Sequence, residues 1–77
     1  MTHKLPYDLP RERMRKTELA SRYSPHTSPG SARRNLLRWM KMNPELMERL
    51  GETGYKDSQR YFTPRQVGII YEMLGEP

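Results

Sequence analysis

The stretch GYKDSQRYFTPRQV, residues 54–67, decides the fold class, because it joins a polar loop to the start of a helix. Tyr55 and the pair formed by Tyr61 and Phe62 are aromatic residues that suit short strands. The residues between them, 56–60, are all polar and have the length of a small hairpin loop. We therefore predict a two-stranded β-hairpin, although no Asn-Gly or Asp-Gly pair marks its turn. Tyr55 and Phe62 are expected to point inward, and Tyr61 is expected to be more exposed.

The second half of the stretch is a helix start. Thr63 can cap the helix while Gln66, three residues later, returns a hydrogen bond, and Pro64 suits the first helical position. Gly75 is expected to end this helix. Its apolar face comprises Val67, Ile70, Tyr71 and Leu74. A last helix is therefore predicted to follow the hairpin directly.

Three more helices are predicted before this stretch. The first covers residues 17–23 and stops before Pro25, and a turn rich in Pro, Thr, Ser and Gly follows it. The second covers residues 32–42, and the third ends at Gly51. The predicted caps are Thr17 for the first helix, Ser28 or Ser31 for the second, and Asn43, followed by Pro44, for the third. The pattern predicts a mainly α-helical domain with one small two-stranded β-hairpin.

Residues 32–42 separate apolar and basic side chains onto two faces of a helix. The apolar face comprises Ala32, Leu36, Trp39 and Met40. We expect Trp39 to be the central anchor of the core. The opposite face carries Arg34, Arg38 and Lys41, with Arg33 and Leu37 at the border. No Asp or Glu occurs between Glu18 and Glu45, so this face is either a binding surface for a polyanion or a solvated surface without a ligand.

The composition is that of a small, basic chain with a thin core. Of its 77 residues, 34% are hydrophobic, which is low for a globular domain. Lys and Arg number 14 against 9 acidic residues, and the resulting net charge of +5 is common among proteins that bind polyanions. There is no cysteine, which excludes disulfides and thiolate metal sites.

Residues 1–15 form the most irregular part of the sequence. They contain two prolines and no sustained apolar period, so they are predicted to be a flexible basic arm. Residues 16–77 would then form one small domain. The alternative is an extended strap in which Leu5, Tyr7 and Leu9, at strand spacing, pack on the domain.

No arrangement of residues indicates an enzyme, a metal site or a cofactor. His3 and His26 are the only histidines, and neither has a neighbour at ligand spacing. No glycine-rich loop has the spacing and the Lys that cradle a phosphate. No apolar run is long enough for a membrane span or a signal peptide, so a cytoplasmic location is expected.

The order of predicted elements resembles that of winged helix-turn-helix domains, most closely the MerR-like and excisionase-like branch. Residues 17–20 (TELA) resemble the opening helix, 33–39 the groove-facing helix, and 54–55 with 60–67 the wing and the helix after it. The resemblance implies a second helix in the major groove and a wing against the backbone or minor groove. No dimerisation helix of the MerR type follows Pro77, so a monomer or a weak side-by-side oligomer is expected.

The region from Thr17 to Pro77 also resembles a family of short uncharacterised proteins of Bacteroides-type bacteria and their mobile elements, a domain of unknown function. The similar residues are Glu18-Leu19-Ala20, Tyr23-Ser24-Pro25, Ala32, Leu36, Trp39, Asn43-Pro44-Glu45-Leu46, Gly54-Tyr55, Arg60, Phe62-Thr63-Pro64, Gln66-Val67 and Leu74-Gly75-Glu76-Pro77. This resemblance implies a lineage and no chemistry.

The expected function is binding of double-stranded DNA, in transcription or mobile-element regulation. Arg34 and Asn35 are the residues most suited to base edges, because Arg pairs with guanine and Asn with adenine. The expected DNA contacts are Ser31, Arg33, Arg34, Asn35, Arg38 and Lys41 in the helix, Lys56, Ser58, Gln59 and Arg60 in the wing, and Arg11, Arg13, Arg15 and Lys16 in the arm. The alternative is a protein-interaction module that binds an acidic partner through the basic face or through exposed residues among Met40, Met42, Met47 and Met73.

Overall fold

Four helices and two short strands make up residues 13–77, the part of the chain that the computed structural model describes. In chain order they are β1 (Met14–Arg15), α1 (Lys16–Tyr23), α2 (Pro29–Lys41), α3 (Pro44–Gly51), β2 (Tyr61–Phe62) and α4 (Pro64–Leu74). The two strands pair antiparallel. The predicted class, mainly α-helical with a small two-stranded antiparallel sheet, is confirmed, and it is compatible with a winged-helix-like fold.

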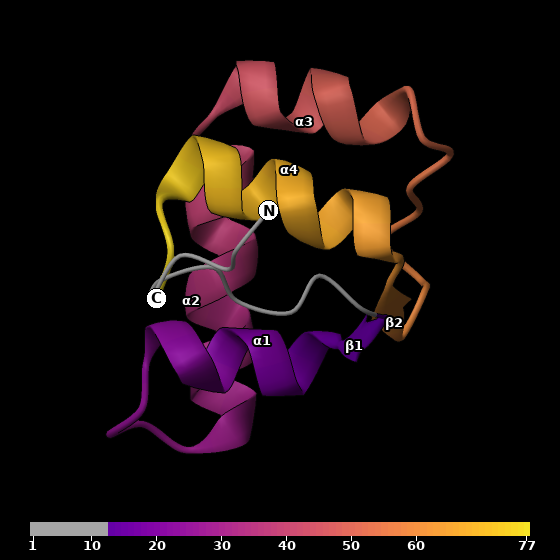
Figure 1. Ribbon diagram of the computed structural model, residues 1–77. Coiled ribbons are helices and arrows are strands. Elements are labelled where there is room, and N and C mark those ends of the chain that lie inside the picture. The colour runs from indigo at the N-terminus through magenta and orange to yellow at the C-terminus, as the bar shows by residue number, and fades with distance from the viewer. Residues whose placement is uncertain (1–12) are drawn as a thin grey trace, which may run out of the picture.

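The helices enclose one core to which every element contributes. Figure 1 shows α1, α4 and α3 lying roughly one above another, with α2 running across them. α1 packs on α2, and α3 packs on both α2 and α4. The buried hydrophobic residues are Met14, Leu19, Ala20, Ala32, Leu36, Met40, Leu46, Leu50, Phe62, Val67, Ile69, Ile70 and Tyr71. α2 therefore contributes to the core through one side only and leaves the other free for solvent or a ligand.

The small sheet is not the predicted hairpin. β2 pairs with β1, near the other end of the chain, with Met14 opposite Phe62 and Arg15 opposite Tyr61. Tyr55 lies in irregular backbone, although its ring stacks on that of Phe62 at 6.0 Å between centroids. A buried Met14 opposite a buried Phe62 gives this pairing an apolar side, and the polar residues 56–60 offer β2 no such partner.

The pairing also moves the boundary of the domain. Met14 and Arg15 were predicted to belong to a flexible arm, but they form a strand whose Met14 side chain lies in the core. The N–H of Lys16 then donates to the carbonyl of Arg60 at 2.9 Å, which ties the start of α1 to the residue before β2. The rest of the predicted arm and the strap with Leu5, Tyr7 and Leu9 lie outside the described residues.

Three of the four predicted helix caps are confirmed. Ser28 accepts from the N–H of Ser31, and Asn43 accepts from the N–H of Leu46. Thr63 forms the complete capping box with Gln66. α1 is the exception, because it begins at Lys16 straight after β1 and has no side-chain cap, so Thr17 lies inside the helix.

Trp39 is not the core anchor that its position predicts. Its side chain is 39% exposed, whereas Ala32, Leu36 and Met40, spaced by four residues along α2, are buried. Trp39 lies at the edge of this apolar face, and it is not among the residues packed against the core. The sequence pattern placed it inside because helical periodicity gives the direction of a side chain but not the presence of a neighbour to cover it.

None of the helices within residues 13–77 has the length and apolar character needed to cross a bilayer.

Candidate nucleic-acid interface

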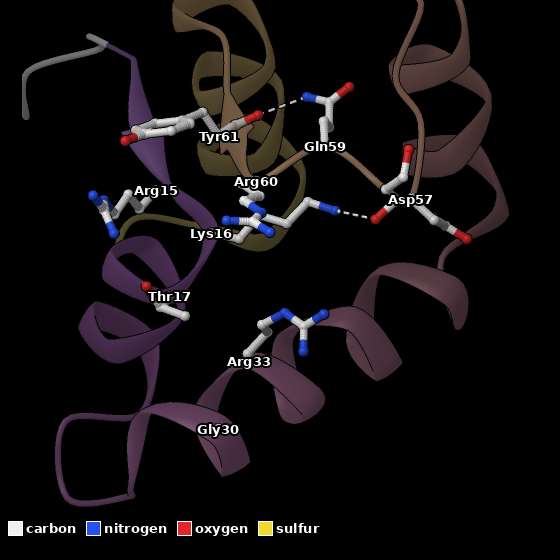
Figure 2. Close-up of a pocket in the computed structure, with 10 residues that line it drawn as sticks. Arg15, Lys16, Thr17, Gly30, Arg33, Asp57, Gln59, Arg60 and Tyr61 are labelled. Atoms are coloured by element: carbon white, nitrogen blue, oxygen red, sulfur yellow. Dashed lines mark hydrogen bonds between the residues drawn. The ribbon is translucent and has the colours of Figure 1, made fainter.

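A cavity of about 500 Å³ opens where the first turns of α1 and α2 face the loop before β2. The residues that line it are Arg15, Lys16, Thr17, Gly30, Arg33, Asp57, Ser58, Gln59, Arg60 and Tyr61. Figure 2 shows Arg33 on α2 facing Lys16 and Arg60, with Asp57 at the end of the Lys16 side chain. Segments that are far apart in the sequence therefore meet at one depression.

The lining of this cavity is cationic. Four of its residues are basic and only Asp57 is acidic. Within residues 13–77 the ion pairs are Arg22 with Glu18 at 3.5 Å and Arg49 with Glu72 at 2.7 Å, and neither involves a lining residue. The positive charge of the cavity is thus not neutralised by salt bridges with described residues.

Lys16 forms the floor of the cavity. It is only 3% exposed, and its Nζ donates to the carbonyl oxygen of Asp57 at 2.9 Å. The same ammonium lies 4.7 Å from the ring centre of Tyr55 and 5.7 Å from that of Phe62, distances typical of cation–π contacts. Burial lowers the pKa of Lys16 from its ordinary value, Asp57 opposes this and Arg33 adds to it. Lys16 was expected to contact DNA beside the arm, but its ammonium is held inside the protein.

Tyr61 forms one wall with two arginines above its ring. The guanidinium carbon of Arg13 lies 4.4 Å from the ring centre and that of Arg15 lies 5.4 Å from it. Arg15 lies opposite Tyr61 in the pairing of β1 with β2, and Arg13 directly precedes β1, so both reach the ring. The two arginines are two residues apart in the sequence, and this spacing could have indicated that both contact the same side chain.

The predicted contact residue Gln59 is used inside the protein. Its Oε1 accepts from the N–H of Lys56 at 2.9 Å, and its Nε2 donates to the carbonyl of Tyr61 at 2.7 Å and to the Oε1 of Gln66 at 2.8 Å. Gln66 is buried, and its Nε2 donates to Thr53 at 2.8 Å. These bonds hold the loop against the start of α4, so Gln59 positions its neighbours and has little capacity left for a ligand.

The basic face of α2 lies along the helix beyond the cavity. Arg34, Arg38 and Lys41 are exposed and do not line the cavity, whereas Arg33 does. Arg34 donates to the hydroxyl of Ser31 at 3.2 Å, and Arg38 donates to the Oδ1 of Asn35. Ser31 and Asn35 therefore hold two of the cations along the helix surface.

The remaining predicted contacts divide between the loop and the arm. Lys56 is exposed outside the cavity, and Ser58 and Arg60 are exposed on its rim. Arg13 and Arg15 are exposed beside Tyr61, and Arg11 lies outside the described residues. The structure thus brings Arg15, Lys16, Arg33, Ser58, Gln59 and Arg60 to one place, and it leaves Arg34, Arg38 and Lys41 on the adjoining helix surface.

Four lining residues were not among the predicted contacts. They are Thr17, Gly30, Asp57 and Tyr61. The pairing of β1 with β2 brings the first turn of α1 to this loop, and a pairing between segments 46 residues apart leaves no local sequence signal. Within residues 13–77, no group of three or more His, Asp or Glu side chains lies close enough to hold a metal ion, and His26 is exposed.

The fold and this site define a small, mainly helical domain with a cationic cavity beside a basic helix face. The chain belongs to the family described as Domain of unknown function (DUF4248), which matches residues 12–77. The match includes β1, in agreement with its place in the fold. No curated protein and no solved structure matches the chain significantly.

Proposed function

We propose that this protein binds double-stranded DNA through α2 and the loop of residues 56–60, and that it acts by binding and not by catalysis. The observation that carries the proposal is the group of four exposed cations on α2, Arg33, Arg34, Arg38 and Lys41. None of the four is in an ion pair with a described residue. A helix that presents several unneutralised cations on one side suits the phosphates that flank a groove.

The resemblance to winged helix-turn-helix domains supports a specific pose. α2 enters the major groove, where Arg34 is the residue best able to reach a guanine edge. Asn35 is half-buried and its Oδ1 accepts from Arg38, so its part is to orient Arg38 more than to read adenine. The loop of residues 56–60 takes the place of the wing. The side chain of Gln59 bonds to the N–H of Lys56 and to the carbonyl of Tyr61, and these bonds fix the loop without a hairpin.

The proposed biological role is regulation of transcription or of a mobile element in the cytoplasm of a Bacteroides-type bacterium. The regulatory role rests on the resemblance to MerR-like and excisionase-like domains, and the bacterial origin rests on the resemblance to short uncharacterised proteins of Bacteroides-type bacteria. A single domain of this size covers few base pairs. We expect it to act as a monomer or as side-by-side copies on a longer site.

Fluorescence anisotropy with a labelled duplex tests the proposal. Neutralising about six phosphates predicts a loss of affinity of roughly 10³-fold or more between 50 and 200 mM salt. The double change Arg34→Ala with Arg38→Ala should weaken binding at least about tenfold. Arg65→Ala is the matched control, because Arg65 is an exposed arginine at the start of α4. Affinity that ignores both salt and the Arg34 and Arg38 changes would refute the proposal.

A second candidate function is binding of an acidic protein. The observation that favours it is the apolar surface near the end of α2, where Trp39 is 39% and Met42 is 73% exposed beside Lys41. An amphipathic acidic segment could place apolar side chains on this surface and carboxylates on the neighbouring cations. Nuclease-treated lysate distinguishes the two candidates, because a protein partner is captured without nucleic acid and its capture is lost with Trp39→Ala.

A further inference from the structure

The cavity between α1, α2 and the loop before β2 adjoins the part of α2 that carries Arg34, Arg38 and Lys41, and these three side chains do not line it. Arg33 and Arg60 reach it from α2 and from the loop, and Arg15 reaches it from β1. Its volume of about 500 Å³ lies within the usual range of small-molecule sites. Residues of this cavity can contact a bound group from several sides, whereas a helix face contacts it from one side.

The chemistry of the lining selects an anion. Arg33 and Arg60 are exposed, and neither is in an ion pair with a described residue. A guanidinium offers a planar fork of donors that matches the oxygens of a phosphate. The hydroxyls of Thr17 and Ser58, both exposed on the lining, supply neutral donors of the kind that complete a phosphate site.

The same lining does not suit recognition of a base by stacking. Tyr61 is the one aromatic residue among the lining residues, and Arg13 and Arg15 lie over its ring at 4.4 and 5.4 Å. The amide of Gln59, which could read a base edge, is bonded to Lys56, Tyr61 and Gln66. The groups left free are cationic and hydroxylic, so a bound nucleotide is held by its phosphate.

Lys16, at the floor of the cavity, adds positive charge without filling the space that a ligand would occupy. The Nζ of Lys16 is held on the carbonyl of Asp57, so its charge stays beneath the cavity while its donors are turned to the protein. The carboxylate of Asp57 is the one acidic group of the lining and opposes an anion. Four cations against one carboxylate still leave the lining positive.

We propose that this cavity is a phosphate-binding site for a nucleotide, in which Arg33 and Arg60 hold the phosphate. The phosphate comes either from the DNA backbone or from a free nucleotide, and the same side chains bind the phosphate group in both cases. The first source rests on the proposed function, and the second does not.

Titration of the whole protein, labelled with ¹⁵N, tests the site by NMR. The probes are inorganic phosphate, deoxyadenosine 5′-monophosphate, deoxyadenosine and a short duplex. Inorganic phosphate and deoxyadenosine monophosphate should both shift the amide signals of residues 15–17, 30–33 and 57–61, whereas deoxyadenosine should not. The double change Arg33→Gln with Arg60→Gln should weaken monophosphate binding at least about tenfold, because two charge-assisted contacts are lost. Arg34→Gln with Arg38→Gln is the matched control, and it should leave monophosphate binding unchanged.

Each outcome either supports the site or overturns it. Shifts at the cavity that the Arg33 and Arg60 changes abolish support it, and the probe that causes them identifies the source as the duplex, the free nucleotide or both. Equal shifts with deoxyadenosine, or equal weakening by the two pairs of variants, overturn it. Duplex binding that survives the Arg33 and Arg60 changes with no cavity shifts overturns the site and leaves the proposed function standing. Cavity shifts with the monophosphate in a protein that does not bind the duplex support the site and overturn the proposed function.

Discussion

A single buried amide, that of Gln66, connects three backbone segments. Its Oε1 accepts from the N–H of Thr63 at 3.0 Å and from Gln59 at 2.8 Å, and its Nε2 donates to Thr53 at 2.8 Å. The capping half of this arrangement follows from the spacing of Thr63 and Gln66 in the sequence. The bonds to Gln59 and Thr53 could not be predicted, because they depend on the path of a loop with no regular period.

Gln66→Ala should lower the free energy of unfolding by about 2 kcal/mol, since it removes half of the capping box and leaves buried polar groups without partners. Chemical denaturation measures the loss. Arg65→Ala, at the exposed neighbouring position, should change stability by no more than about 0.5 kcal/mol. Equal effects of the two substitutions would show that the amide network is not what stabilises the loop.

Tyr55 should make the protein less stable in alkali. Burial, followed by the charge of Asp57, raises the pKa of Tyr55 from 10.0 to about 12. Between these values the unfolded chain releases a proton that the folded protein keeps, so stability falls as pH rises through this window. Tyr23, whose pKa burial also raises, acts in the same direction. Lys16, whose pKa is lowered from 10.5, acts in the opposite direction below its ordinary value.

Thermal unfolding between pH 9 and 12 tests this for Tyr55. The midpoint should fall with pH in the natural protein, and it should fall less steeply in Tyr55→Phe, which keeps the ring that stacks on Phe62. Tyr61→Phe is the control, since Tyr61 is a neighbouring half-buried tyrosine. The same slope in the natural protein and in Tyr55→Phe would contradict the assignment.

At the scale of elements, local signals predicted the helices and a non-local pairing escaped prediction. The caps Ser28, Asn43 and Thr63 each lie next to a proline and act within one turn, so their sequence context is sufficient. β1 contains two residues, which is too short for a period of two to be recognised. Its pairing with β2 also determines which cations share the cavity, so the missed strand explains most of the missed site.

β1 should be an integral part of the domain. Met14→Ala removes a buried side chain opposite Phe62 and should lower the free energy of unfolding by about 2 kcal/mol or more. Met42→Ala, the same change at a residue that is 73% exposed, should cost no more than about 0.5 kcal/mol. Chemical denaturation of both variants measures the difference. A Met14→Ala protein as stable as Met42→Ala would mean that residues 14–15 behave as the flexible arm first predicted.

At the scale of the whole molecule, α2 divides the cations between two sites. Arg33 faces the cavity, and Arg34, Arg38 and Lys41 continue along the helix. Helical periodicity predicted the second group directly, with Arg33 at its border. The cavity itself requires the positions of α1 and the loop relative to α2, and these depend on packing that no single segment encodes. The two groups can therefore be tested as separate surfaces of one molecule.

Trp39 reports on one of these surfaces and not on the other. It is the single tryptophan of the chain and is 39% exposed next to Arg38. It follows Arg33 by six residues, about 9 Å along the helix axis and on a different side. Duplex DNA bound along α2 should shield Trp39 from acrylamide and reduce the quenching of its fluorescence. Deoxyadenosine monophosphate in the cavity should leave the quenching unchanged.

The control for this measurement is the Arg34→Ala and Arg38→Ala protein at a duplex concentration that saturates the natural protein. Its Trp39 should be less protected from acrylamide than in the natural protein, because less of the variant is bound to DNA. Protection of Trp39 by the monophosphate would mean that the two sites are not separate. A duplex that binds without protecting Trp39 would contradict the placement of the DNA along the end of α2 that carries Arg38 and Trp39.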